Sequence, residues 1–192
     1  EVEGLKLTSP ATTWAVLGAV LGVDDLVVLG DAILRCPRIP GTSRRERPPL
    51  GTREELEEAI GRGRRRGLPR LRATLALARD GSASPPETHM RLALLRAGLP
   101  DPELDIDVRS GDGRFLGCSE VGYRRYRVVF EYESEHHPVD RRQWNRDIEK
   151  YRDYRAEGWE PVCITAHLLY RRPSEFGRVA RNALLAAGWR PE

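Results

Sequence analysis

Residues 114–137, RFLGCSEVGYRRYRVVFEYESEHH, carry the pattern that decides the fold. Two runs rich in aromatic and β-branched residues flank the short segment YRRY, which predicts two strands joined by a turn. Side chains alternate between the faces of a strand, so Glu131, Glu133 and Glu135 lie on one side and the apolar side chains between them lie on the other. Because like charges at this spacing repel one another, the pattern indicates a positive group between the carboxylates.

The segments on either side of this stretch complete an α/β pattern. The run ELDIDV reads as a preceding strand joined to the next by the tight turn SGDG, and WEPVCIT reads as a fourth strand. Helical periodicity covers the segments before, between and after these strands. The order is therefore helix, three strands, helix, strand, helix, in which a meander receives a fourth strand through a crossover helix. The expected strands span 103–108, 114–121, 126–133 and 159–165, and the expected helices span 86–98, 140–156 and 174–187.

The part of the chain before this pattern has helical signals throughout. Thr52 with Glu55, for example, forms a capping box at the start of an amphipathic run. The segment GSASPP at 81–86 is the clearest break in the chain. We therefore expect a helical segment over 1–80 and an α/β domain over 84–192. The sequence begins with glutamate in a regular pattern, so we also expect it to be a piece of a longer protein.

Composition and charge leave most function classes open. The chain has 192 residues, of which 32% are charged, and a net charge of +3. No apolar run is long enough for a membrane span, none has the layout of a signal peptide, and three widely spaced cysteines favour reduced thiols in a cytoplasmic protein. Basic residues crowd two segments, which is typical of surfaces that hold phosphate backbones and also of solvated helix faces. The two groups are Arg62, Arg64, Arg65, Arg66, Arg70 and Arg72, and Arg141, Arg142, Arg146, Lys150, Arg152 and Arg155.

Three carboxylates are candidates for a metal site. Glu120 lies at the end of the second expected strand, and Glu131 and Glu133 lie on the third, so pairing of these strands as a hairpin brings the acids near one another. Acids on neighbouring strands suit Mg²⁺ or Mn²⁺, hard cations that prefer oxygen ligands and can activate water for attack on a phosphate. The same acids are also compatible with a solvent-facing sheet surface that binds nothing.

Two longer runs carry a family resemblance. GRFLGCSEVGYRRYRVVFEYESEHH and DRRQWNRDIEKYRDYRAEGWEPVCIT resemble a widespread actinobacterial family related to the very-short-patch mismatch-repair endonuclease. That family has the restriction-endonuclease-like fold, with the motif PD-(D/E)XK, and the similarity covers most of 84–190. The upstream run LTSPATTWAVLGAVLGVDDLVVLGDAILR resembles the helical segment that precedes the nuclease-like domain in the family. Longer members carry a segment related to abortive-infection antitoxins further upstream. The resemblance implies a restriction-endonuclease-like core, α-β-β-β-α-β, preceded by a helical subdomain.

The resemblance implies a set of site residues on the strands. The family's first acid, usually aspartate, falls on Glu120 and its second falls on Glu131, so these two would hold Mg²⁺ or Mn²⁺. Glu133 falls on the third position, where many relatives have lysine. The family's histidine falls on His137, which would assist the attacking water or the leaving group, or alternatively cap or pack the following helix.

The resemblance also implies residues on the helices. The glutamate of the helix before the sheet falls on Glu87, which by its spacing also forms a capping box with Ser84. A basic position one turn later falls on Arg91, which can also pair with Glu87. The WxRD stretch of the long helix falls on Arg146 and the acid that follows it. DNA phosphates would be bound by Arg91, Arg141, Arg142 and Arg146.

Two functions follow from these residues. The first is a metal-dependent endonuclease-like protein that hydrolyses DNA phosphodiester bonds in repair or phage defence. The second is a nuclease-fold module without efficient chemistry that binds nucleic acid or a partner protein in a toxin–antitoxin or regulatory system. The second is motivated by departures from the family pattern: Glu120 at the usual aspartate, Ser134 at the usual glycine, and no lysine at the third motif position.

Overall fold

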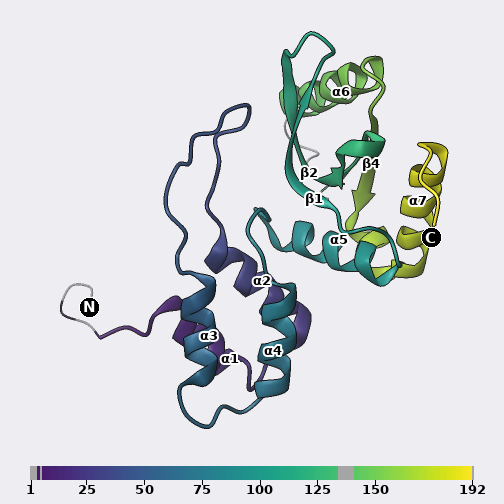
Figure 1. Cartoon of the computed structure of the whole chain (residues 1–192). Helices are drawn as coiled ribbons and strands as arrows, with labels where there is room; N and C mark the ends of the chain where they lie inside the picture. Colours follow the sequence, from purple (N-terminus) through teal and green to yellow (C-terminus); the bar gives the residue numbers. More distant parts are fainter. Residues whose placement is uncertain (1–3, 5, 134–140, 192) are drawn as a thin grey trace. The chain divides into compact units, whose positions relative to one another are not determined.

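The computed structural model describes residues 4, 6–133 and 141–191, except for the side chains of 141–145 (Figure 1). The chain divides into two compact units, each of which is described on its own. The first comprises Glu1–Arg38 and Arg44–Thr88, and the second comprises Ile39–Ser43 and His89–Glu192. No helix in the described part of the chain is long and apolar enough to cross a membrane.

The first unit consists of helices, as its periodicity predicts. One large buried side chain from each of four helices meets in a shared core, and these residues, Trp14, Leu26, Leu56 and Leu71, are at most 1% exposed. The expected capping box is present, because the Thr52 hydroxyl accepts a hydrogen bond from the backbone of the Glu55 residue, whose side chain bonds back to Thr52. The helices are α1 (Pro10–Leu17), α2 (Val23–Leu34), α3 (Arg53–Gly61) and α4 (Leu68–Leu77).

A buried acid ties the end of this unit to helix α2. Asp31 is 1% exposed and accepts hydrogen bonds from the backbone N–H of Arg79 at 2.8 Å and from the hydroxyls of Ser82 and Thr88 at 3.3 and 2.8 Å. A buried polar group is costly unless it is hydrogen-bonded, and these three donors satisfy the Asp31 carboxylate. These hydrogen bonds within the first unit therefore account for the burial of Asp31.

The second unit is built on a four-stranded mixed sheet in the order β1-β2-β3-β4. Neighbours β1–β2 and β2–β3 are antiparallel, whereas β3 and β4 are parallel and are connected through helix α6. The element order agrees with the predicted helix, three strands, helix, strand, helix. The strands are β1 (Glu103–Arg109), β2 (Phe115–Tyr123), β3 (Val128–Glu133) and β4 (Glu160–Thr165), and the helices are α5 (Pro85–Arg96), α6 (Arg141–Ala156) and α7 (Pro173–Ala186). The first residues of α5, up to Thr88, belong to the first unit.

Turns between the strands lie where the sequence placed them. In the SGDG segment, the backbone N–H of Ser110 donates to the carbonyl of Arg114 at 2.9 Å. The YRRY segment forms a short 3₁₀ turn, Arg124–Tyr126, followed by Arg127 in the left-handed region with φ +53°. This 3₁₀ turn is labelled η1, and a π-helical turn, η2 (His167–Arg171), precedes α7.

Different side chains cover the two faces of the sheet. On the α7 face, Phe130 and Ile164 of the sheet pack with Phe176 of the helix, and all three are fully buried. On the α6 face, a smaller apolar cluster includes Val129 and Tyr154. Alternation along β3 therefore places Phe130 and Tyr132 on the side opposite Glu131 and Glu133, as the sequence pattern predicts, while Val129 shares the side of the acids.

Strand β1 changes face at one residue. Leu104 packs against the core on the α7 face, whereas Ile106 lies in the cluster on the α6 face. Residues two apart in a regular strand share a face, so the alternation is interrupted between them. Asp105 is the interrupting residue, and its φ is +52°, a left-handed conformation that aspartate adopts more readily than most residues.

Strand β2 changes face at the matching position. Val121 packs in the core on the α7 face, whereas Ser119 bonds to side chains on the α6 face. The strands pair Leu104 with Val121 and Ile106 with Ser119, so the two changes of face lie side by side. Glu120 occupies the change of face on β2, and its position therefore depends on this local irregularity.

Candidate functional site

A buried carboxylate lies at the centre of the α6 face. Glu131 of β3 is 5% exposed, and its Oε1 accepts hydrogen bonds from the Ser119 hydroxyl at 2.6 Å and from the Lys150 ammonium at 2.9 Å. Burial raises the pKa of the Glu131 carboxyl, while Lys150 and Ser119 act in the opposite direction by stabilising the charge. Oε2 of Glu131 has no hydrogen bond to any residue of the described ranges.

Lys150 of α6 is the positive group that the acidic pattern requires. Its Nζ lies 5.6 Å from the ring centroid of Tyr151 and 5.4 Å from that of Tyr154, so the two rings flank the ammonium. In the sequence, Lys150 stands out only as one member of a basic helix. A usable signal was present, because Lys6 and Lys150 are the two lysines among 32 basic residues, and every other position has arginine.

Two tyrosines complete this network. Tyr154 is fully buried, and its hydroxyl lies 3.3 Å from the Ser119 hydroxyl. The hydroxyl of Tyr151 donates to Glu133 at 2.7 Å. Burial raises the pKa of both tyrosines, and the neighbouring carboxylates add to the effect, so both hydroxyls stay protonated. Glu131, Glu133, Ser119, Lys150, Tyr151 and Tyr154 are called the Glu131 cluster below.

Glycine at position 117 makes room for this cluster. A Cβ placed on Gly117 would lie 2.6 Å from the Tyr154 hydroxyl oxygen, closer than any ordinary contact. The strand β2 can therefore approach α6 closely enough for Ser119 to reach both Glu131 and Tyr154 only because residue 117 lacks a side chain.

Glu120 lies on the neighbouring strand and is held by the backbone of β3. Its Oε2 accepts a hydrogen bond from the backbone N–H of Tyr132 at 2.9 Å. The three predicted acids therefore share the β2–β3 part of the sheet, but Glu131 and Glu133 contact α6 while Glu120 contacts the strand backbone. Three or more His, Cys, Asp or Glu side chains arranged to hold a metal ion are not found among the described residues.

The helix residues predicted for the site have other surroundings. Glu87 is 5% exposed and accepts hydrogen bonds from the backbone N–H of Ala83 at 2.6 Å and from the Ser84 hydroxyl at 2.9 Å, so it closes the first turn of α5. Arg91 is 2% exposed, whereas Arg146 is exposed on α6. The remaining predictions concern His137 and the side chains of Arg141 and Arg142, which lie outside the described residues.

Comparison with known proteins identifies relatives but no family. The chain is 28% identical over 183 residues to Uncharacterized protein MT2308 and to Uncharacterized protein Rv2248, from Mycobacterium tuberculosis strains CDC 1551 / Oshkosh and ATCC 25618 / H37Rv. Each match covers 94% of this chain and 63% of the relative, so the chain spans less than two thirds of the length of these proteins. No family model and no solved structure matches the chain.

Proposed function

We propose that the second unit is a metal-dependent nuclease that hydrolyses DNA phosphodiester bonds on a restriction-endonuclease-like core. The observation that carries the proposal is the pairing of the buried Glu131 with Lys150, 2.9 Å apart, on the strand next to Glu120. Burying a charged pair costs desolvation free energy, and strongly perturbed carboxyl groups concentrate at functional sites. The resemblance to the very-short-patch repair endonuclease family supports the same assignment.

The acids of this site suit Mg²⁺ or Mn²⁺ in donor type. Mg²⁺ is commonly held by one or two carboxylates, with water and substrate phosphates completing its coordination, so a cage of three protein ligands is not required. Glu120 and Glu131 would hold the ion, and the Oε2 of Glu131 has no hydrogen bond within the described ranges. A bound ion would lower the pKa of its water and offset negative charge on the phosphate.

The remaining residues have separate roles in this proposal. Lys150 opposes the increase in the pKa of Glu131 and adds positive charge where negative charge develops on the phosphate. Glu133, fixed by the Tyr151 hydroxyl, would orient the attacking water or accept its proton. His137 would serve the leaving group, and Arg146, with Arg141 and Arg142 at the start of the same helix, would bind backbone phosphates.

The test is cleavage of supercoiled plasmid and of mismatched duplex DNA with Mg²⁺ or Mn²⁺. Glu131→Gln and Lys150→Met should each lower the rate by about 100-fold or more, because each removes charge at the reacting phosphate. Glu149→Gln is the matched control, because Glu149 is exposed and precedes Lys150 on the same helix. This variant should cleave DNA at the rate of the unchanged chain. Absence of cleavage with either metal, or cleavage that survives Glu131→Gln, would refute the proposal.

A second candidate function is nucleic-acid or partner binding without hydrolysis. It is favoured by the Lys150 contact, because the ammonium already balances the charge of Glu131 in the absence of any metal. This function predicts salt-sensitive DNA binding in EDTA that persists in Glu131→Gln. Binding under those conditions together with no cleavage would select this second function.

A further inference from the structure

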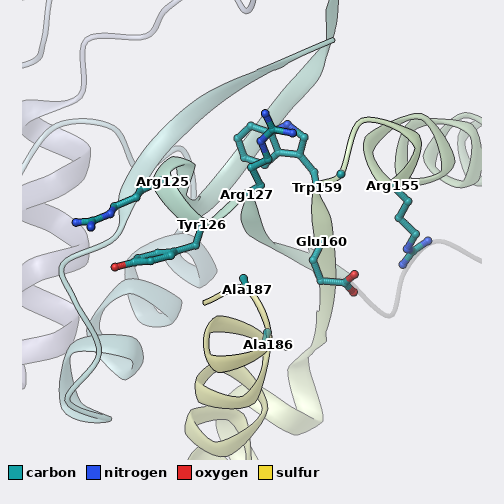
Figure 2. A pocket seen from close by; sticks show the side chains of 10 residues that line it. Arg125, Tyr126, Arg127, Arg155, Trp159, Glu160, Ala186 and Ala187 are labelled. Carbon is teal, nitrogen blue, oxygen red and sulfur yellow. The ribbon is translucent and has the colours of Figure 1, made fainter. Parts of the chain in front are cut away.

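A hollow lies in the same unit, at the opposite end of strand β3 from the Glu131 cluster (Figure 2). Its volume is about 840 Å³, within the range of sites that hold small organic ligands. It is bordered by the η1 turn, the starts of β3 and β4, the residues after α6 and the end of α7. The lining residues are Arg125, Tyr126, Arg127, Arg155, Gly158, Trp159, Glu160, Ala183, Ala186 and Ala187.

The charge of this hollow is positive. Arg125, Arg127 and Arg155 line it, against the single carboxylate of Glu160. None of these three arginines forms an ion pair with an acid in the described ranges, and all three are exposed. Their guanidinium groups instead contact neutral groups: Arg127 and Arg155 donate to backbone carbonyls at 3.0 and 3.5 Å, and Arg125 lies 5.5 Å from the Tyr126 ring centroid. The arginines therefore keep their charge available for an anion.

Arg127 is held in place by its backbone and by its side chain. Its φ of +53° is a left-handed conformation that costs free energy in a residue other than glycine. Its carbonyl accepts from the backbone N–H of Glu160 at 2.7 Å, and its Nη1 donates to the carbonyl of Glu157 at 3.0 Å. Gly158 adds a steric reason, because a Cβ there would lie 3.3 Å from Nη1 of Arg127. The guanidinium is thus fixed at the hollow before any ligand arrives.

The uncharged part of the lining suits a flat ring. Tyr126 is partly exposed, Trp159 is 7% exposed, and the end of α7 contributes only alanines. Figure 2 shows Tyr126 and Arg125 extending from the turn to one side, Arg155 and Glu160 on the other, and Ala186 and Ala187 on the α7 side. Aromatic and small apolar groups accept the face of a nucleobase, while arginines accept its phosphate.

We propose that this hollow, called the arginine pocket, binds a nucleoside phosphate, either free or as the terminal nucleotide of a DNA strand. The arginines would hold the phosphate, and the ring would lie between Tyr126 and the alanines of α7. The site is separate from the Glu131 cluster, since Val128 at the pocket end of β3 lies three residues before Glu131, roughly 10 Å along the strand. The pocket would therefore bind its ligand whether or not the Glu131 cluster is catalytic.

The test is calorimetric titration of the full chain with AMP, adenosine, inorganic phosphate and a 5′-phosphorylated single strand of ten nucleotides. AMP should bind more tightly than either adenosine or phosphate, because it engages both halves of the pocket. The double variant Arg125→Gln/Arg155→Gln should weaken AMP binding by about tenfold or more, and Tyr126→Leu should reduce the preference for AMP over phosphate. Binding of AMP without binding of the strand would identify a free nucleotide as the ligand, and binding of the strand at least as tight as that of AMP would identify a terminal nucleotide.

Two controls make the result specific. Arg152→Gln removes an arginine that is exposed on α6 and does not line the pocket, and it should leave AMP binding unchanged. Glu131→Gln should also leave it unchanged, which separates this proposal from the nuclease proposal. Thermal unfolding of each variant confirms that it is folded. No binding of AMP or of the strand, binding of phosphate as tight as that of AMP, or an equal loss in Arg152→Gln would overturn the proposal.

Discussion

The two faces of the sheet in the second unit bury different kinds of side chain. The α7 face is closed by apolar side chains such as Phe130 and Phe176, whose rings meet edge to face with centroids 6.2 Å apart. The α6 face buries a carboxylate and a hydroxyl of the sheet, and a partly exposed ammonium group of α6 pairs with the carboxylate. Apolar burial stabilises a fold directly, whereas a buried ion pair is often neutral or unfavourable compared with apolar residues of similar size. The comparison indicates that the α7 face maintains the fold, while the α6 face carries the polar groups on which the proposed function rests.

The largest expected effect is on the α7 face. Phe176→Ala should lower the free energy of unfolding by about 3–5 kcal/mol, because it removes a fully buried ring and leaves a cavity. Urea unfolding followed by circular dichroism measures the change. Leu185→Ala, at a position 36% exposed on the same helix, is the matched control and should cost less than about 1 kcal/mol. Similar losses in both variants would contradict the assignment of stability to this face.

Removing one partner of the ion pair should be the next largest effect. Lys150→Met leaves Glu131 buried without its cation, and we expect a loss of about 2–3 kcal/mol, below the cost for a fully buried pair because the Lys150 side chain is 23% exposed. The double variant Lys150→Met/Glu131→Gln should recover most of this loss, since it leaves no unpaired charge. A double-mutant cycle measured by urea unfolding gives the coupling free energy. A loss in the double variant equal to the sum of the losses in Lys150→Met and Glu131→Gln would show that the pair is not coupled.

Local chemistry in the sequence accounts for much of this fold. The order of helices and strands, the SGDG and YRRY turns, and the shared face of Glu131 and Glu133 all follow from periodicity and turn composition. The interruption at Asp105 and Glu120 does not, because no residue type there requires a change of face. Such an irregularity depends on how two strands meet two different cores.

The hydrogen-bond partners of the acids also could not be predicted from the sequence. Lys150 reaches Glu131 because of the register of α6 against β3, and that register is set by long-range packing. The arginine pocket has the same origin, since it is assembled from segments near 125, 155 and 185 that are far apart in the sequence. Sequence patterns therefore indicated which groups are charged, while tertiary packing decided which groups meet.

A smaller effect should follow from filling the space beside Tyr154. Gly117→Ala places a methyl group 2.6 Å from the present position of the Tyr154 hydroxyl, so the ring must shift and its contact with Ser119 is lost. We expect a loss of about 1–2 kcal/mol in the free energy of unfolding. Gly61→Ala is the control, because a Cβ at Gly61 would meet no atom within 4 Å. If Gly117→Ala unfolds at the same urea concentration as Gly61→Ala, β2 and α6 are not packed as tightly as the α6 face requires.

The smallest expected effect is a pH dependence that belongs to the α6 face alone. Burial raises the pKa of Glu131 above its ordinary value of 4.5, so the folded protein binds this proton more tightly than the unfolded chain does. Its contribution to stability is therefore complete below pH 4.5 and declines as the pH rises through the folded pKa. The free energy of unfolding of the unchanged chain, minus that of Glu131→Gln, should fall with increasing pH in this window.

The decline should extend to higher pH in Lys150→Met, because the lysine opposes the increase in the pKa of Glu131. The pH profile of Glu149→Gln should run parallel to that of the unchanged chain, and a difference for Glu131→Gln that grows with pH would show that the ion pair outweighs burial at this carboxyl.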